Sequence, residues 1–128
     1  MNKLIIDVVG EKIFLMIITS SNIYNITYEN TKINYEKLTK LINDFLISYN
    51  LKIFDISTIY VNKGPGSFAG IRNSLSTVKA FNVAKKIDYY CYSLDDFEGE
   101  IDVRYENIPD LCKKYNIKKN LINPVYIS

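Results

Sequence analysis

Three stretches at the start of the chain are dominated by β-branched and aromatic residues, and each predicts a β-strand. They cover residues 3–9, 12–19 and 22–29. Only Gly10-Glu11 and Ser20-Ser21 separate one stretch from the next. Separators of this length and composition favour tight turns, so we expect the three strands to form an antiparallel meander.

A helical pattern follows over residues 34–50. Hydrophobic side chains recur there at intervals of three and four, which places them on one stripe of a helix that can pack on a sheet. Asn34 is the expected N-cap, because its side chain can accept a hydrogen bond from the first turn. The residues of the stripe are Tyr35, Leu38, Leu41, Ile42, Phe45, Leu46 and Tyr49.

The rest of the pattern predicts an α/β layered domain. Residues 56–62 form an apolar strand, a glycine-rich turn leads into a second helix over about 67–86, and residues 89–93 form a fifth strand. The order β-β-β-α-β-α-β predicts one mixed sheet whose later strands are parallel and joined by crossovers. The remainder, about 94–128, is expected to be a short irregular tail. In that tail a helix from Pro109 to Tyr115 and short strands at 101–105 and 123–128 are expected.

Composition narrows the possible functions. The 128 residues are 48% apolar and 23% charged, typical of one globular domain, so we take 1–128 as a single unit. A net charge of +2 without a clustered basic face favours no direct nucleic-acid partner. Histidine is absent, which removes the commonest metal ligand and general base. Cys91 and Cys112 have no CxxC spacing, so we expect no metal site and no disulfide framework.

Localisation is predicted from what the N-terminal region lacks. The apolar stretch 13–18 is too short to span a bilayer. Charged residues interrupt the first apolar run, and no small-residue cleavage site follows it. We therefore expect a cytoplasmic protein with no membrane association.

The turn at Gly64-Pro65-Gly66-Ser67 allows two interpretations. A strand, a glycine-rich turn and a helix N-terminus can present free N–H groups to a phosphate. Against this, Ile71 stands where a Walker A motif needs lysine, and the glycine spacing misses the dinucleotide-binding pattern by one residue. The structural interpretation places Pro65 and Gly66 in a type II turn, with Ser67 as N-cap.

The helix after this turn has two uncharged stripes. Phe68, Ile71, Leu75 and Val78 form an apolar stripe that can pack on the sheet, but spacing alone does not decide which stripe faces the sheet and which faces a partner. The reverse stripe consists of Gly70, Ser74, Thr77, Phe81 and Ala84, all small or apolar. A solvent-facing helix normally carries Lys and Glu, so this stripe predicts a contact. The contact is either a helix of another protein or the C-terminal tail of the same chain.

The motif GPGSFAGIR closely resembles the signature GPGSFTGxR of the TsaB (YeaZ) family, which assists the N6-threonylcarbamoyladenosine (t6A) modification of tRNA. Ala69 replaces the usual threonine. The family also reads IDTS near its start, where this chain has Ile6-Asp7-Val8-Val9. The matching residues are Gly64, Pro65, Gly66, Ser67, Phe68, Gly70, Ile71 and Arg72.

This resemblance implies one lobe of the actin/Hsp70-like (ASKHA, ribonuclease H-like) fold, shortened relative to members that have a second lobe. It also implies a non-catalytic subunit that pairs with a TsaD-like paralogue. A homodimer is also possible, a TsaE-like ATPase belongs to the complex, and tRNA is contacted only indirectly. It implies no cofactor of its own, with ATP or ADP and a metal bound only in the complex.

The expected interface lies on the two helices. Its residues are Tyr35, Leu38, Ile42, Gly70, Ile71, Ser74, Thr77 and Phe81.

A second hypothesis is that the chain is an enzyme. That alternative is a small ATP-dependent phosphotransferase or nucleotide hydrolase that uses the GPGS turn and Asp7.

Overall fold

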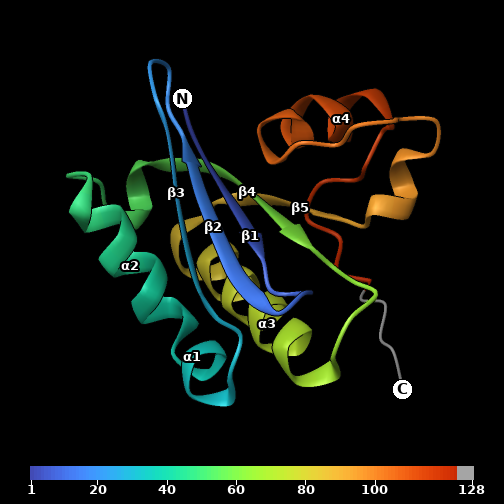
Figure 1. The fold of residues 1–128 in the computed structure, drawn as a ribbon. Helices are drawn as coiled ribbons and strands as arrows, with labels where there is room; N and C mark the ends of the chain where they lie inside the picture. The colour runs from blue at the N-terminus through green and yellow to red at the C-terminus, as the bar shows by residue number, and fades with distance from the viewer. Residues whose placement is uncertain (124–128) are drawn as a thin grey trace.

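A computed structural model describes residues 1–123 of the chain and places a five-stranded mixed sheet at its centre (Figure 1). The strand order is β3-β2-β1-β4-β5. β1, β2 and β3 form the expected antiparallel meander, whereas β4 pairs parallel with β1 and β5 parallel with β4. The strands are β1 (Asn2–Asp7), β2 (Lys12–Ile18), β3 (Ile23–Glu29), β4 (Ile56–Asn62) and β5 (Asp88–Tyr92).

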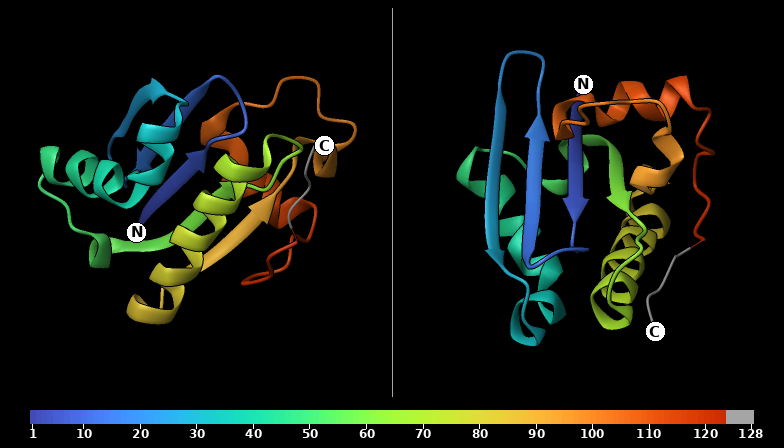
Figure 2. Two further views of the ribbon diagram at one scale, coloured as in Figure 1. Left: turned by 90° about the horizontal axis from the view of Figure 1, so that it is seen from below. Right: turned by 45° about the vertical axis from the view of Figure 1, so that its right-hand side comes forward.

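Helices cover the sheet from both sides. The two views of Figure 2 place α1 (Lys32–Glu36), α2 (Leu38–Ser48) and α3 (Phe68–Lys85) on one face and α4 (Ile108–Lys114) on the other. The predicted helix at 67–86 is confirmed as α3. The chain thus forms the expected α/β layers around two hydrophobic cores, one on each face.

The alternation of side chains along the strands decides which core each residue joins. On β1, Leu4 and Ile6 point towards the three helices, and Ile5 points towards α4. All three side chains are fully buried, and each such burial stabilises the fold by about 1.5–3 kcal/mol.

The single helix predicted over 34–50 is instead two helices. Lys37, with φ −110° and ψ 30°, interrupts it between α1 and α2. The N-cap is Thr31 rather than Asn34, because the extended backbone at Thr31 lets its hydroxyl accept from the Asn34 N–H at 3.4 Å. The Asn34 side chain donates instead to the Glu29 carbonyl at 2.8 Å.

The segment after β5 is more ordered than an irregular tail. It contains two short 3₁₀ turns, Leu94–Phe97 and Tyr105–Asn107, followed by α4, which confirms the predicted short helix. The expected strand at 101–105 is wrong. Of the strand expected at 123–128, residues 124–128 lie outside the described part. No helix in residues 1–123 is long and apolar enough to cross a membrane.

Candidate functional site

A buried polar network is centred on the Asp7 carboxylate at the end of β1. It is 9% exposed, and its Oδ1 accepts from the Val9 N–H at 2.9 Å. Its Oδ2 accepts from Asn62 Nδ2 at 3.2 Å and from the Tyr105 hydroxyl at 2.9 Å. β1 and β4 are parallel neighbours, which brings Asp7 and Asn62 together at their carboxyl ends.

Tyr105, from the segment after β5, covers this carboxylate. Its ring stacks on Phe14 with centroids 3.9 Å apart. Burial raises the pKa of the Tyr105 hydroxyl, and the charge of Asp7 raises it further, so the hydroxyl stays a donor. A hollow of about 440 Å³ lies beside the pair and is bordered by Asp7, Asn62 and Leu94.

The same network holds the glycine-rich turn in place. Asn62 Oδ1 accepts from the Gly64 N–H at 3.0 Å, so one side chain joins Asp7 to the motif. The predicted type II turn is wrong, since Gly64 and not Gly66 has the positive φ, at 115°. Ser67 is at the N-cap position as predicted, but its side chain makes no capping hydrogen bond.

Gly66 of the motif is needed for close packing. A Cβ on Gly66 would lie 3.1 Å from Val9 Cγ1 and 3.2 Å from the Val9 carbonyl oxygen. A Cβ on Gly70 would lie 3.5 Å from the Val8 carbonyl oxygen. The turn therefore rests directly on Val9, and these contacts account for Gly66 without a phosphate ligand. At Gly70 the distance to Val8 is an ordinary van der Waals contact, and the nearer atom, Ser67 Oγ at 3.3 Å, belongs to a side chain.

The residues expected at the interface lie mostly inside the chain. α1 and α2 pack beside α3 on the same face of the sheet. Of the uncharged stripe on α3, Gly70, Ser74 and Phe81 are buried and Thr77 is half-buried, whereas Ala84 near the end of the helix is exposed. Most of the stripe therefore lies inside the chain. Of the eight expected residues, Leu38, Ile42, Gly70, Ile71, Ser74 and Phe81 are buried, and Tyr35 and Thr77 are half-buried.

The opposite side of α3 is the one that faces solvent, and we call it the outer face. Phe68, which belongs to the first apolar stripe, is 52% exposed there, and Val83 is 69% exposed. A shallow groove of about 540 Å³ runs along it. The groove is lined by Arg72, Leu75, Ser76, Lys79, Ala80, Val83 and Ile122.

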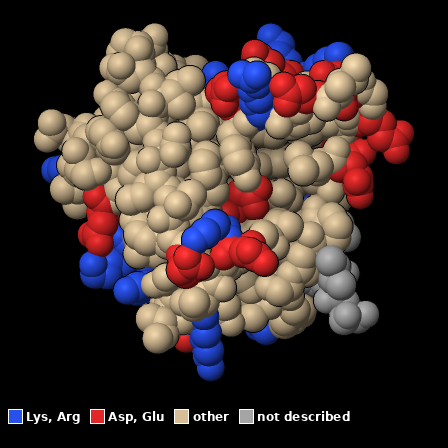
Figure 3. Space-filling view, in the orientation of Figure 1, with Lys and Arg blue, Asp and Glu red and all other residues tan. Residues whose placement is uncertain are grey.

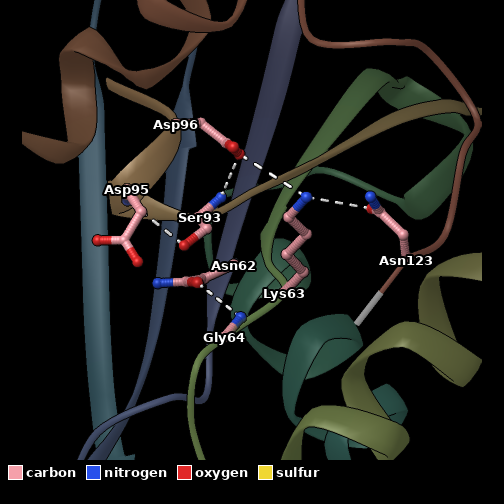
Figure 4. Close-up of polar contacts among 7 residues, drawn as sticks. All are labelled: Asn62, Lys63, Gly64, Ser93, Asp95, Asp96 and Asn123. Carbon is pink, nitrogen blue, oxygen red and sulfur yellow. Dashed lines mark hydrogen bonds and ion pairs between the residues drawn. The ribbon is translucent and has the colours of Figure 1, made fainter. Parts of the chain in front are cut away.

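Lys63 holds a second polar cluster, which the sequence did not reveal (Figure 4). Its side chain is only 12% exposed, and its Nζ lies 3.2 Å from Asn123 Oδ1 and 3.8 Å from Asp96 Oδ2. Asp96 Oδ2 also accepts from the Ser93 N–H at 2.8 Å, closing a capping box. The cluster fastens the segment after β5 to the end of β4.

Tyr92 carries a fully buried hydroxyl that has no hydrogen-bond partner among residues 1–123. Burial raises the pKa of this hydroxyl well above its usual range. We expect Tyr92→Phe to raise the free energy of unfolding by about 1 kcal/mol, because it removes an unsatisfied polar group and keeps the ring. Urea denaturation measures the change, and a loss of stability would show that the hydroxyl has a partner.

Comparisons with known proteins support a family assignment and the fold of this chain. A model of the family TsaD, tRNA N6-adenosine threonylcarbamoyltransferase, matches residues 30–99, more than half of the chain. No curated protein is similar enough in sequence to count as a relative.

Two solved structures share the fold. YeaZ from Pseudomonas aeruginosa superposes with a TM-score of 0.66 at 17% identity, over 72% of this chain and 43% of that one. T. thermophilus RuvC in complex with a Holliday junction substrate gives 0.52 at 10% identity, over 77% and 68%. The chain thus spans less than half the length of YeaZ. These likenesses confirm the predicted fold class, a lobe of the ribonuclease H-like, ASKHA type.

Proposed function

Because the chain belongs to the TsaD family of tRNA N6-adenosine threonylcarbamoyltransferases, we propose that it is a non-catalytic partner of a TsaD-like enzyme in the t6A modification of tRNA. The enzyme supplies the catalytic groups, and a TsaE-like ATPase joins the same complex. tRNA is contacted through the enzyme. A nucleotide or metal is bound in the complex rather than by this chain alone.

The state of Asp7 supports a structural role for the motif region. Both carboxylate oxygens already accept hydrogen bonds from within the chain. Gly66 rests on Val9, where a phosphate would need open space. The alternative function, nucleotide chemistry on the GPGS turn and Asp7, stays a prediction that no contact of these residues favours.

The outer face of α3 is the observation that carries the proposal. It carries Phe68 and Arg72 of the family motif, and its groove combines the apolar side chains of Leu75, Val83 and Ile122 with two cations, Arg72 and Lys79. α3 contains no Asp or Glu. Such a surface complements a helix that carries apolar residues flanked by carboxylates. A stable interface needs about 800 Å² from each partner, with apolar anchors at its centre.

The proposal predicts that Ala80→Arg weakens binding to the TsaD-like protein of the same organism at least about tenfold, because a cation is forced into an apolar contact. Ala80 is exposed and lines the groove, so the variant should fold normally. Gel filtration of the mixed proteins and titration calorimetry measure the loss.

The matched control is Ser20→Arg, which adds the same side chain to the exposed β2–β3 turn. It should bind like the unmodified chain. If the unmodified chain forms no complex, the proposed function is wrong. If it binds and Ala80→Arg binds equally well, the outer face of α3 is not the interface.

A further inference from the structure

The two edges of the sheet differ in whether another segment of the chain pairs with the edge strand. Beyond β5, the Asn120 N–H donates to the Tyr89 carbonyl at 2.8 Å, and an isolated bridge joins Tyr90 to Lys119. Beyond β3, no element among residues 1–123 pairs with the strand, which lies at the margin of the sheet in Figure 2. β3 is therefore the open edge.

The hydrogen bonds at the two ends of the β2–β3 ladder show which main-chain groups this edge presents. The Thr19 N–H donates to the Asn22 carbonyl at 2.9 Å, and the Asn30 N–H to the Glu11 carbonyl at 3.0 Å. Both pairs continue the register of the ladder, in which hydrogen-bonded pairs alternate with non-bonded ones.

Counting inward from these ends, Tyr24, Ile26 and Tyr28 direct their N–H and C=O groups to β2. Ile23, Asn25 and Thr27 direct theirs away from the sheet. None of these outward groups has a partner within residues 1–123. The Glu29 carbonyl at the end of the strand is already used, since it accepts from the Asn34 side chain.

The edge also lacks the usual features that prevent strand pairing. Natural edges are short, charged, bulged or interrupted by proline. β3 has seven residues, no proline and no charge before Glu29. Its register with β2 is unbroken. Figure 3 shows no Lys, Arg, Asp or Glu over the upper part of the β2–β3 hairpin.

We propose that β3 pairs antiparallel with β3 of a second copy of this chain, around a two-fold axis at Asn25. Ile23 of one copy then lies opposite Thr27 of the other, and Asn25 lies opposite itself. Every outward N–H and C=O of these three residues meets an outward group of the other copy. The two five-stranded sheets become one continuous sheet.

The partner strand is β3 of a second copy, because the side chains of two antiparallel β3 strands match each other. On the face towards the helices, Tyr24 of one copy is paired with Ile26 of the other, an aromatic and β-branched pair that stabilises antiparallel strands. No two like charges are brought together, since residues 23–28 are uncharged. A two-fold contact also closes, so it yields a dimer and not a filament.

Exposed apolar side chains beside the edge extend the contact. Ile23 is 50% exposed. At the end of α2, Ile47 is 62% exposed, and Tyr49 stacks on Tyr24 of the edge with ring centroids 3.9 Å apart. This surface is separate from the outer face of α3, so the dimer does not depend on the proposed function.

Sedimentation equilibrium of the full chain over a range of concentrations tests the proposal. We expect a concentration-dependent dimer for the unmodified chain. Asn25→Lys places two cations opposite each other at the axis and should weaken association at least about tenfold. Thr39→Lys adds the same charge at an exposed site on α2 and should leave association unchanged.

A cysteine at the axis gives a second, independent readout. Asn25→Cys should form a disulfide-linked dimer under mild oxidation, because opposed Cα atoms in a hydrogen-bonded pair lie about 5.5 Å apart. Thr39→Cys should not, and the native Cys91 and Cys112 are buried. A chain that stays monomeric, or a dimer lost in Ala80→Arg but kept in Asn25→Lys, would overturn the proposal.

Discussion

Ser74→Arg is expected to unfold the chain. Ser74 is fully buried on the uncharged stripe of α3, and its hydroxyl donates to the Ile71 carbonyl at 2.9 Å. A guanidinium there would be buried without a carboxylate on the same helix. An unpaired buried charge costs about 3–5 kcal/mol, a large part of the stability of a domain this size.

Ser76→Arg is the matched control, because Ser76 lies two positions further along α3 and is exposed. Circular dichroism and urea denaturation should show a native-like Ser76→Arg and a largely unfolded Ser74→Arg. If both variants were equally stable, the stripe would be accessible to a partner after all, as the first interpretation of the sequence proposed.

Asp7→Ala should lower the free energy of unfolding by about 2–4 kcal/mol. Three donors lose their acceptor: the Val9 N–H, Asn62 Nδ2 and the Tyr105 hydroxyl. Tyr105→Phe removes one of these donors but keeps the ring stacked on Phe14, so it should cost only about 1 kcal/mol.

The double variant separates this network from a general loss of packing. With Asp7 replaced, the Tyr105 hydroxyl no longer has its acceptor, so removing it should add little further destabilisation. Urea denaturation of the four proteins in the cycle measures the coupling. Additive losses would mean that Tyr105 and Asp7 do not act on each other in solution.

The strands and helices could largely be predicted from the sequence. The short separators Gly10-Glu11 and Ser20-Ser21 predicted the meander, and the three-and-four spacing predicted α2 and α3. These features are local, because turn chemistry and side-chain periodicity act between residues close in the chain. The break at Lys37 was missed, since its residue type gives no signal for a helix end.

The candidate site could be predicted only in part. Asp7 and the motif were identified, but the partner Tyr105 lies 98 positions from Asp7, and no spacing connects them. Lys63 was missed for the same reason, because its contacts with Asp96 and Asn123 arise only when the segment after β5 folds back over β4.

By itself, the sequence determined that one stripe of α3 is made of small or apolar residues without charge, which predicts a contact. Only the tertiary structure decided which segment makes that contact. A helix of the same chain and a helix of another protein require the same side chains, because both need close backbone approach without charge. The structure places α1 and α2 beside α3, which buries most of the stripe and leaves the face that carries Phe68 and Val83 to solvent.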